Sequence, residues 1–397
     1  MNFPETGLLS AAININLSIA ARQLYAQRAV LIALLFITSI VLSPWKTGYA
    51  ADTETPSVTT PVKWHPGHYY TLMSAGKNNP KHLTQIYKEL KETPALRGVQ
   101  IRYEWAELES AEGVYNFTSI DKRLAELAAQ KKRLIVLLQT KSFDPKTALV
   151  PDYLKAEIYD GGVFPFGDYR GNVIRGYNIK LWNPQVHNRF VALVSALGKH
   201  FNSHPYFEGI GLTETSMGKP MTELSKNEVD NFYNNLLSIN QQLRKHFPNT
   251  MTFQFTNYPR PILESFIGKL KAMGTALGGP DVFLDDQGLL SKEPNSPKGV
   301  YNYYPELSGI VPLTPSVMQA NHANTQHSGT IKAPAVSELL DFARDKLKAN
   351  YIFWTRAPGH HPKILKILNE PNQTNDPAGG LDPTCPKAYS SCMTKNF

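Results

Sequence analysis

A single acid at the end of an apolar run is the first residue that could perform acid–base chemistry. The stretch GIGLTETSMG (209–218) places Glu214 between two threonines, after an apolar segment. Burial and nearby negative charge raise the pKa of such an acid, so that it can donate a proton. The structural alternative is a buried acid at a strand end that pairs with a cation.

Two further acids, Asp285 and Asp286, close the apolar segment PDVFLDD (280–286). Two carboxyl groups can break an O-glycosidic bond, because one protonates the leaving oxygen while the other attacks or activates water. Asp286, with Asp285 beside it, is our best candidate for the second carboxyl; a turn cap or a solvated loop is the alternative. Glu104 and Glu107 are further candidates, although rim salt bridges are the simpler role for them.

Eight β-rich runs alternate with helical patterns and must position these acids. The runs cover 68–75, 98–105, 133–140, 207–214, 251–258, 280–286, 310–320 and 350–357. Between them, segments such as 119–132 place apolar residues at helical spacing. Strands buried on both faces that alternate with helices indicate a parallel sheet. We therefore predict an α/β protein with a closed (β/α)8 TIM barrel over 64–370, rather than an open doubly wound sheet.

In such a barrel the chemistry lies at the C-terminal ends of the strands, where the loops converge. Polar and aromatic side chains stand at these ends, and rings stack on sugars while amides and acids bind hydroxyls. The residues predicted to bind substrate are Arg102, Trp105, Thr213, Tyr258, Gln319, Trp354 and Arg356. For the two arginines, ion pairs with Glu104 or Glu214 are an open alternative. The long connection 144–183 is expected to shape one side of the binding face.

Composition excludes other classes. The chain has 41 Lys and Arg against 33 Asp and Glu, and no basic block dense enough for nucleic acid. It has no Walker, HExxH or GxSxG motif, and the adjacent His360 and His361 read as loop residues. We expect neither a metal nor a cofactor, and we expect a monomer, although no motif fixes the oligomeric state.

The N-terminal 50 residues have the pattern of an export signal. Arg22 and Arg28 precede the apolar run 29–42, and small residues follow up to Ala50. We predict cleavage after Ala50 and a periplasmic or secreted protein, whose only membrane association is through this signal. An uncleaved anchor is the alternative, but the run is shorter than the roughly 20 residues that a span needs.

The ends of the mature chain complete the predicted organisation. The Thr- and Pro-rich residues 51–63 read as a linker, and 371–397 as a C-terminal tail. The tail holds the only two cysteines, Cys385 and Cys392. In an exported protein they are expected to form one local disulfide.

The segment RGVQIRYEWAELESAEGVYNFTSIDKRLAELAAQKKRLIVLL (97–138) resembles the strand-two to strand-three region of retaining (β/α)8 glycoside hydrolases. This clan includes family 5 cellulases and family 42 β-galactosidases. The matching positions are Glu109, Gly113, Tyr115, Phe117 and Asp121. LWNPQVHNRFVALVSALGKHFNSHPYFEGIGLTET (181–215) resembles the segment that leads to the clan's acid/base on strand four. FWTR (353–356) resembles the strand-eight segment whose tryptophan forms the floor of the sugar subsite.

The resemblance implies that Glu214 is the general acid/base, but two positions depart from the pattern. Thr213 stands where the clan usually has asparagine. The strand-seven nucleophile, a glutamate in the clan, has Gln319 as its nearest match, and an amide cannot form the covalent glycosyl intermediate. An aspartate such as Asp286, farther from Glu214 than about 5.5 Å, would favour a water-mediated inverting route.

Three functional hypotheses follow. The first is an exported glycoside hydrolase that acts on a polysaccharide or oligosaccharide. The second is a catalytically impaired barrel that recognises a cell-envelope or environmental glycan; a structural envelope protein with a vestigial cleft is a third. The sugar, the linkage, endo or exo action, and retention or inversion stay open.

Overall fold

The computed structural model describes residues 57–73, 76–167, 173–293, 295–324 and 333–395. The predicted export signal, 1–50, lies outside these residues. Within the described ranges, no helix combines the length and apolar character that crossing a membrane requires.

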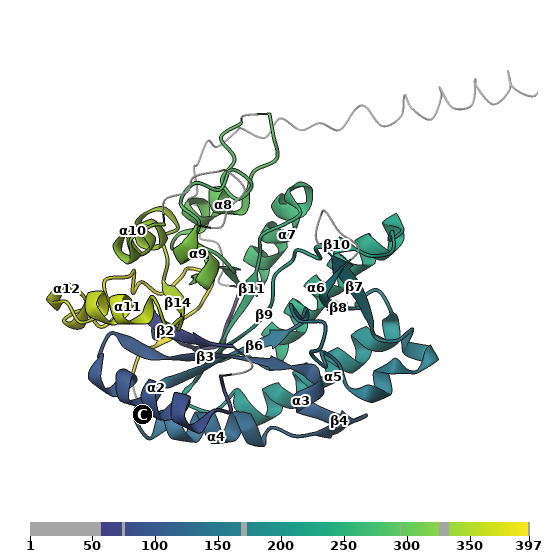
Figure 1. Ribbon diagram of the computed structural model, residues 1–397, viewed down its shortest axis with the longest axis horizontal. Helices are drawn as coiled ribbons and strands as arrows, with labels where there is room; N and C mark the ends of the chain where they lie inside the picture. The colour runs from purple at the N-terminus through teal and green to yellow at the C-terminus, as the bar shows by residue number, and fades with distance from the viewer. Residues whose placement is uncertain (1–56, 74–75, 168–172, 294, 325–332, 396–397) are drawn as a thin grey trace, which may run out of the picture. The chain divides into compact units, whose positions relative to one another are not determined.

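Eight parallel strands form a closed barrel at the centre (Figure 1). In chain order they are β2 (Gly67–Leu72), β3 (Leu96–Glu104), β6 (Arg133–Gln139), β9 (Phe207–Leu212), β11 (Met251–Phe255), β12 (Ala276–Gly279), β13 (Leu313–Val317) and β14 (Tyr351–Thr355). Pairing of β14 with β2 and of β9 with β11 leaves no open edge. The predicted (β/α)8 barrel is confirmed.

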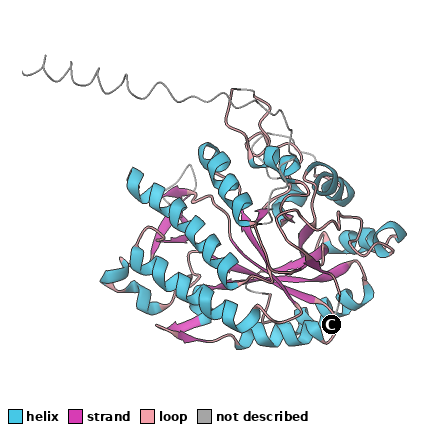
Figure 2. Cartoon of the chain, turned by 180° about the vertical axis from the view of Figure 1, so that it is seen from behind, coloured by secondary structure: helices cyan, strands magenta, loops and turns pink. Residues whose placement is uncertain are grey.

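Helices cover the outside of this barrel (Figure 2). The longer ones are α2 (Pro80–Glu92), α4 (Thr118–Ala128), α5 (Pro184–Phe201), α6 (Lys226–His246), α7 (Arg260–Met273), α8 (Val300–Leu307) and α11 (His361–Leu368). The short ones are α3 (Trp105–Leu108), η1 (Asp152–Lys155), η2 (Glu157–Tyr159), α9 (Gln319–Ala323), α10 (Val336–Asp341), η3 (Phe342–Lys346) and α12 (Pro371–Thr374). In α4 the helical spacing buries Ile120, Leu124 and Leu127, as the sequence pattern predicts.

The long connection after β6 folds into a small antiparallel sheet. It consists of β7 (Val163–Gly167), β8 (Ile174–Ile179) and β10 (Lys219–Pro220), and β10 belongs to the loop after β9. A bridge between Lys141 and Asn178 joins this sheet to the end of β6. The connection is therefore anchored beside Glu214, where it can shape one side of the barrel mouth. A separate hairpin, β4 (Glu109–Ala111) and β5 (Val114–Tyr115), follows α3.

The sixth strand differs from the predicted one. It is β12, with the sequence ALGG, and the predicted strand 280–286 is a loop whose Val282 and Phe283 are buried. A Cβ on Gly278 would lie 2.6 Å from the Phe255 ring, so glycine permits close packing here. Two glycines weaken the strand signal in the sequence. The consequence is that Asp281, rather than Asp286, stands at the end of strand six.

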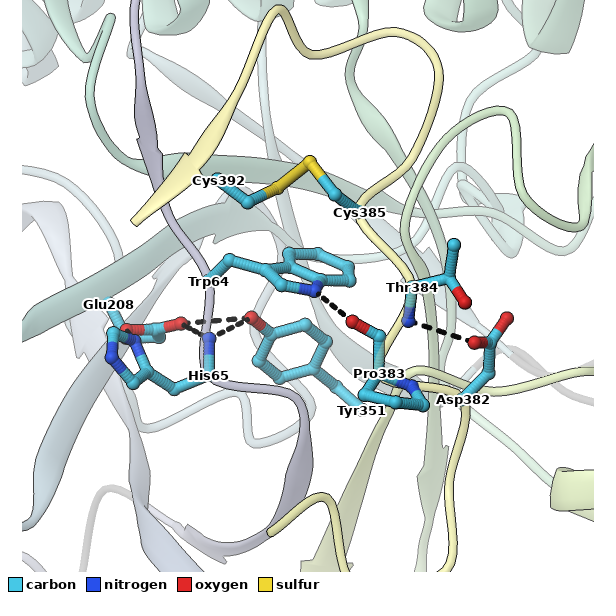
Figure 3. Close-up of a disulfide and its surroundings, with 9 residues drawn as sticks. All are labelled: Trp64, His65, Glu208, Tyr351, Asp382, Pro383, Thr384, Cys385 and Cys392. Atoms are coloured by element: carbon cyan, nitrogen blue, oxygen red, sulfur yellow. Dashed lines mark hydrogen bonds and ion pairs between the residues drawn. A yellow bond between two sulfur atoms is a disulfide. The ribbon is translucent and has the colours of Figure 1, made fainter. Parts of the chain in front are cut away.

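The C-terminal tail packs under the barrel, and the predicted disulfide between Cys385 and Cys392 is present (Figure 3). The strand β15 (Cys392–Met393) pairs with β1 (Val62–Lys63). Val58 and Val62 are buried, so the described part of the predicted linker, 57–63, is packed against the tail. Trp64 links the two segments, because its Nε1 donates to the carbonyl of Pro383 at 2.8 Å (Figure 3).

A buried charge network lies beside Trp64, at the N-terminal end of the strands. The Glu208 carboxylate accepts hydrogen bonds from the His65 backbone N–H at 2.7 Å and from the Tyr351 hydroxyl at 2.8 Å. His65 Nδ1 and Arg133 Nη1 lie 2.9 and 3.2 Å from its Oε2. Burial raises the pKa of Glu208, but the charges and hydrogen bonds of its partners outweigh burial and lower it.

Replacing Glu208 by glutamine should destabilise the barrel, because Arg133 would be left buried without its counter-charge. We expect Glu208→Gln to lower the free energy of unfolding by about 3–5 kcal/mol at pH 7. Since the pKa of Glu208 is lowered by folding, this difference should be present above pH 5 and shrink as the pH falls below 4. Urea denaturation at several pH values measures it, with the exposed Glu264→Gln as control. A loss below about 1 kcal/mol would contradict the account.

Candidate active site

The mouth of the barrel gathers charged groups from three strands. Arg102 is on β3, Glu214 follows β9 and Asp281 follows β12. Burial lowers the pKa of the Arg102 guanidinium, and three nearby carboxylates oppose this effect: Glu214, Asp281 and Glu104. These acids therefore lie within electrostatic reach of one cation, although 110 residues separate Glu104 from Glu214 in the chain.

Asp281 is the acid with the most perturbed environment at the mouth. Burial, followed by the negative charges of Glu214 and Asp286, raises its pKa, and the net value is about 7. A hydrogen bond from Asn321 Nδ2 to Asp281 Oδ1, 3.0 Å long, and the charge of Arg102 act in the opposite direction. A carboxyl with a pKa near 7 can donate or accept a proton at neutral pH. The sequence did not indicate Asp281 as a site residue, because the sixth strand was predicted at 280–286, after its observed position at Ala276–Gly279.

Glu214 is paired with a cation. Lys141 Nζ lies 3.0 Å from Glu214 Oε1 and also donates to the carbonyl of Ser216 at 2.8 Å. The ion pair is the structural alternative anticipated from the sequence. The side chain of Glu214 nevertheless stays 15% exposed, so it also reaches the solvent at the mouth.

Asp286 has a structural task. Its Oδ1 accepts hydrogen bonds from the backbone N–H groups of Gly288 at 2.6 Å and Leu289 at 3.2 Å. It therefore caps the turn that follows, as the alternative role anticipated. Asp285 is half-buried in the same loop. Asp281 is better placed to act with Glu214 than either of them, because it lies two residues after β12 and the charge of Glu214 acts on it.

The end of strand seven carries Met318 where the resemblance implies a carboxylate. Arg102 Nη2 lies 3.6 Å and Thr355 Oγ1 lies 3.1 Å from the Met318 sulfur. Gln319, which the sequence comparison aligned with the nucleophile, begins α9 and is exposed. Neither the thioether of Met318 nor the amide of Gln319 can act as a carboxylate nucleophile.

Glu104 and Glu107 form the expected rim salt bridges. Lys77 Nζ lies 3.1 Å from Glu104 Oε2 and also pairs with Glu107. Gln139 Nε2 donates to Glu104 Oε1 at 3.2 Å. Burial, followed by the hydrogen bond with Glu104, raises the pKa of Glu107 to about 7, although Lys77 opposes the shift.

The two tryptophans predicted as sugar platforms are packed inside the protein. Trp105 donates to Glu109 Oε2 at 2.6 Å, and Trp354 donates to His68 Nδ1 at 3.0 Å. Each is only 1% exposed, which leaves no ring face for a sugar. The platform role therefore does not fit either residue. Tyr258, in contrast, is half-buried at the end of its strand.

Two other predicted binding residues make structural contacts. Arg356 forms a two-pronged ion pair with Glu89, with Nε and Nη2 at 2.8 and 2.7 Å from the two carboxylate oxygens. It pairs with α2 instead of with the acids at the mouth. Thr213 Oγ1 accepts from the Thr140 backbone N–H at 2.9 Å and thereby ties the ends of β6 and β9 together.

One exposed aromatic ring lies close to Glu214. Phe143 is 50% exposed, and its ring centroid lies 4.9 Å from Lys141 Nζ. Phe166, from the small sheet, lies on the same ammonium at 4.4 Å. Phe143 follows the third strand in the sequence, but sequence alone does not reveal that its ring is exposed. The described residues contain no group of three or more His, Cys, Asp or Glu that could hold a metal ion.

Removing the charge of Glu214 should lower the pKa of Asp281, because a like charge raises it. In Glu214→Gln we expect the pKa of Asp281 to fall from about 7 toward the ordinary aspartate value near 4. Carbon-13 NMR titration of aspartate carboxyl carbons measures the change, with the Asp281→Asn spectrum as assignment and Glu264→Gln as control. An unchanged titration in Glu214→Gln would show that the two acids do not interact.

Comparisons with known proteins agree with the fold. No family model and no curated protein matches the sequence. Among solved structures, the catalytic domain of β-amylase from Paenibacillus polymyxa is similar, with a TM-score of 0.53 and 10% identity over 77% of this chain and 98% of that one. A β-galactosidase from the psychrophilic Marinomonas ef1 has a TM-score of 0.49 and 10% identity over 73% of this chain and 54% of that one. At such identity the likeness shows the fold alone: this chain has a TIM barrel like that of the β-amylase domain.

Proposed function

We propose that the protein hydrolyses O-glycosidic bonds in an oligosaccharide or polysaccharide, with Asp281 and Glu214 as its two carboxyl groups. The observation that carries the proposal is the pair itself. Two acids that follow β9 and β12, which are separated only by β11, share the mouth of a closed barrel, and the charge of one helps burial to raise the pKa of the other to about 7. Glycoside hydrolysis requires one protonated and one ionised carboxyl.

The environments of the two acids suggest how the roles divide. Asp281, with its raised pKa, is suited to protonate the leaving oxygen. Lys141 compensates the negative charge of Glu214, which is suited to take a proton from the attacking water. This assignment reverses the role that the family resemblance implies for Glu214. With Met318 at the end of strand seven, a water-mediated inverting route fits better than a covalent intermediate there.

Substrate binding would use the exposed ring beside the acids. Phe143 offers a flat apolar surface near Glu214. Its ring contacts Lys141, and Lys141 forms the ion pair with Glu214. Aromatic rings bind the apolar faces of sugars, which fits a saccharide better than a charged or strongly apolar ligand. The anchored connection between β6 and α5 carries Phe166 against the same lysine and so holds one wall of the site.

The same geometry also favours a second candidate, a barrel that binds a glycan without turnover. The ion pair between Lys141 and Glu214 holds one acid in a structural contact, and Met318 replaces a carboxylate at strand seven. The two candidates differ in one respect: only the hydrolase requires the proton-transfer pair.

Hydrolysis assays on a panel of α- and β-linked oligosaccharides separate the two candidates. We expect Asp281→Asn and Glu214→Gln each to lower kcat by about 10²–10⁴-fold while the protein stays folded. Asp286→Asn, which keeps an oxygen for the turn cap, should lose less than about tenfold. Because Asp281 must be protonated, kcat/KM should fall as the pH rises through about 7.

The result that would overturn the hydrolase is binding of a saccharide without release of sugar by the wild-type protein. A large loss in Asp286→Asn with little loss in Asp281→Asn would instead assign the second carboxyl to Asp286, as the sequence first indicated.

Phe143 should govern saccharide affinity rather than the chemical step. Phe143→Ala should raise KM or Kd about tenfold, which corresponds to about 1.4 kcal/mol, with little change in kcat. Phe143→Trp should retain binding, because it keeps a stacking face. Val114→Ala, at a position 55% exposed on β5, is the matched control for losing an exposed apolar side chain. Unchanged affinity in Phe143→Ala would remove this ring from the site.

A further inference from the structure

A cavity lies between the segments that follow strands seven and eight. Its volume is about 570 Å³, and it is lined by residues of α9, α10 and α11. Its titratable lining residues are His322, His360, Lys363, Lys366, Glu338 and Glu370. None of them belongs to the proposed carboxyl pair or its immediate partners, so this cavity has no role in the chemistry described above.

His322 is the unusual member of this group. Its side chain is 2% exposed, and within the described part of the chain neither ring nitrogen has a hydrogen-bond partner. Leaving a buried polar group without a partner costs about 1–3 kcal/mol, so such groups in folded proteins call for a specific explanation. A ligand in the cavity that His322 lines would supply the missing partner.

The charges around His322 indicate the class of ligand. His360 stacks on His322 with centroids 4.2 Å apart and planes 5° apart, and Lys363 and Lys366 add two positive charges. Of the two acids, Glu338 already accepts the Ala335 backbone N–H at 2.7 Å, and Glu370 is exposed. The lining holds two lysines and two glutamates, and Lys363 is the one of the four whose charge acts on both imidazole rings.

A metal ion does not fit this arrangement. The two imidazole rings are parallel, so their in-plane lone pairs do not converge on a point about 2.0–2.1 Å from both. The lysines would also repel a cation. In eight-stranded α/β barrels, loops after strands seven and eight often bind phosphate, and His322 and His360 follow these two strands here.

We propose that this cavity binds a small oxyanion, a phosphate, sulfate or carboxylate group, with His322 as hydrogen-bond donor and Lys363 as its counter-charge. The anion would complete the hydrogen bonding of His322 and offset the positive charge of the lysines. The site is independent of the proposed hydrolase activity. The cavity nevertheless lies next to the proposed active site, because Asn321, the neighbour of His322 on α9, donates a hydrogen bond to Asp281.

Anion binding in this cavity should be coupled to proton uptake. Burial, then the charges of His360 and Lys363, lower the pKa of His322 to about 4. Burial and the charge of Lys363 likewise lower the pKa of His360. A bound anion favours the protonated form of both rings and so raises their pKa values. The affinity should therefore increase as the pH falls.

Isothermal titration of the full chain with inorganic phosphate, sulfate and acetate tests the proposal, at pH 5.5 and 7.5 and constant ionic strength. We expect saturable binding that is tighter at pH 5.5 and at least tenfold weaker in His322→Phe and in Lys363→Met. His322→Phe keeps a ring to stack on His360, and Lys245→Met, on α6, is the control for losing one positive charge. Glucose 6-phosphate and glucuronate, titrated in parallel, show whether the cavity takes a free ion or an anionic group on a sugar.

Equal affinity in wild type, Lys363→Met and Lys245→Met would overturn the site, as would no binding of any of the five probes. If His322→Phe does not fold, Lys363→Met alone decides the outcome. Failure of the hydrolysis assays would leave this result unaffected, because binding is measured without turnover.

Discussion

Closure of the parallel sheet is the constraint on which the site depends. Because β9 pairs with β11 and β14 pairs with β2, the C-terminal ends of all eight strands meet at one rim. Acids from β9 and β12 then face the same space as the buried guanidinium of Arg102. The charges cannot separate without opening the barrel, so they must be compensated where they are or shift their pKa values.

The buried charges are accommodated differently at the two ends of the barrel. At the N-terminal end, Glu208 receives a backbone N–H, a hydroxyl, an imidazole and a guanidinium, and its pKa is lowered. At the mouth, burial and then the charge of Glu214 raise the pKa of Asp281 to about 7, and the one amide hydrogen bond from Asn321 does not offset them. A fully paired acid holds the fold together, whereas an acid with too few partners is available for proton transfer. The contrast supports a structural task at one end and chemistry at the other.

The fold was largely predictable from the sequence, because apolar runs and amphipathic helices alternate throughout the chain. Seven strands overlap their predicted ranges, and the spacing of Cys385 and Cys392 indicated their disulfide. The sixth strand was missed because its ALGG sequence packs through glycine rather than through bulky side chains. Because of that error the sequence did not indicate Asp281, which lies two residues after the strand.

The site was less predictable, because its properties depend on contacts between distant parts of the chain. Lys141 and Glu214 are 73 residues apart, and neither segment by itself predicts that the two side chains form an ion pair. The sequence indicated Trp354 as a platform and did not indicate Phe143, yet the structure buries the first and exposes the second. Exposure is set by the whole fold, so composition at a strand end does not determine it.

The central claim is that Asp281 and Glu214 act on one glycosidic bond. The most direct measurement is a crystal structure of Glu214→Gln with an oligosaccharide drawn from the panel that the wild-type protein cleaves or binds. The account predicts a glycosidic oxygen within hydrogen-bond distance of the Asp281 carboxyl, with residue 214 on the other side of the sugar and the Phe143 ring against a neighbouring unit. A saccharide bound at the mouth with Asp286 against the glycosidic oxygen, and Asp281 out of reach, would contradict it.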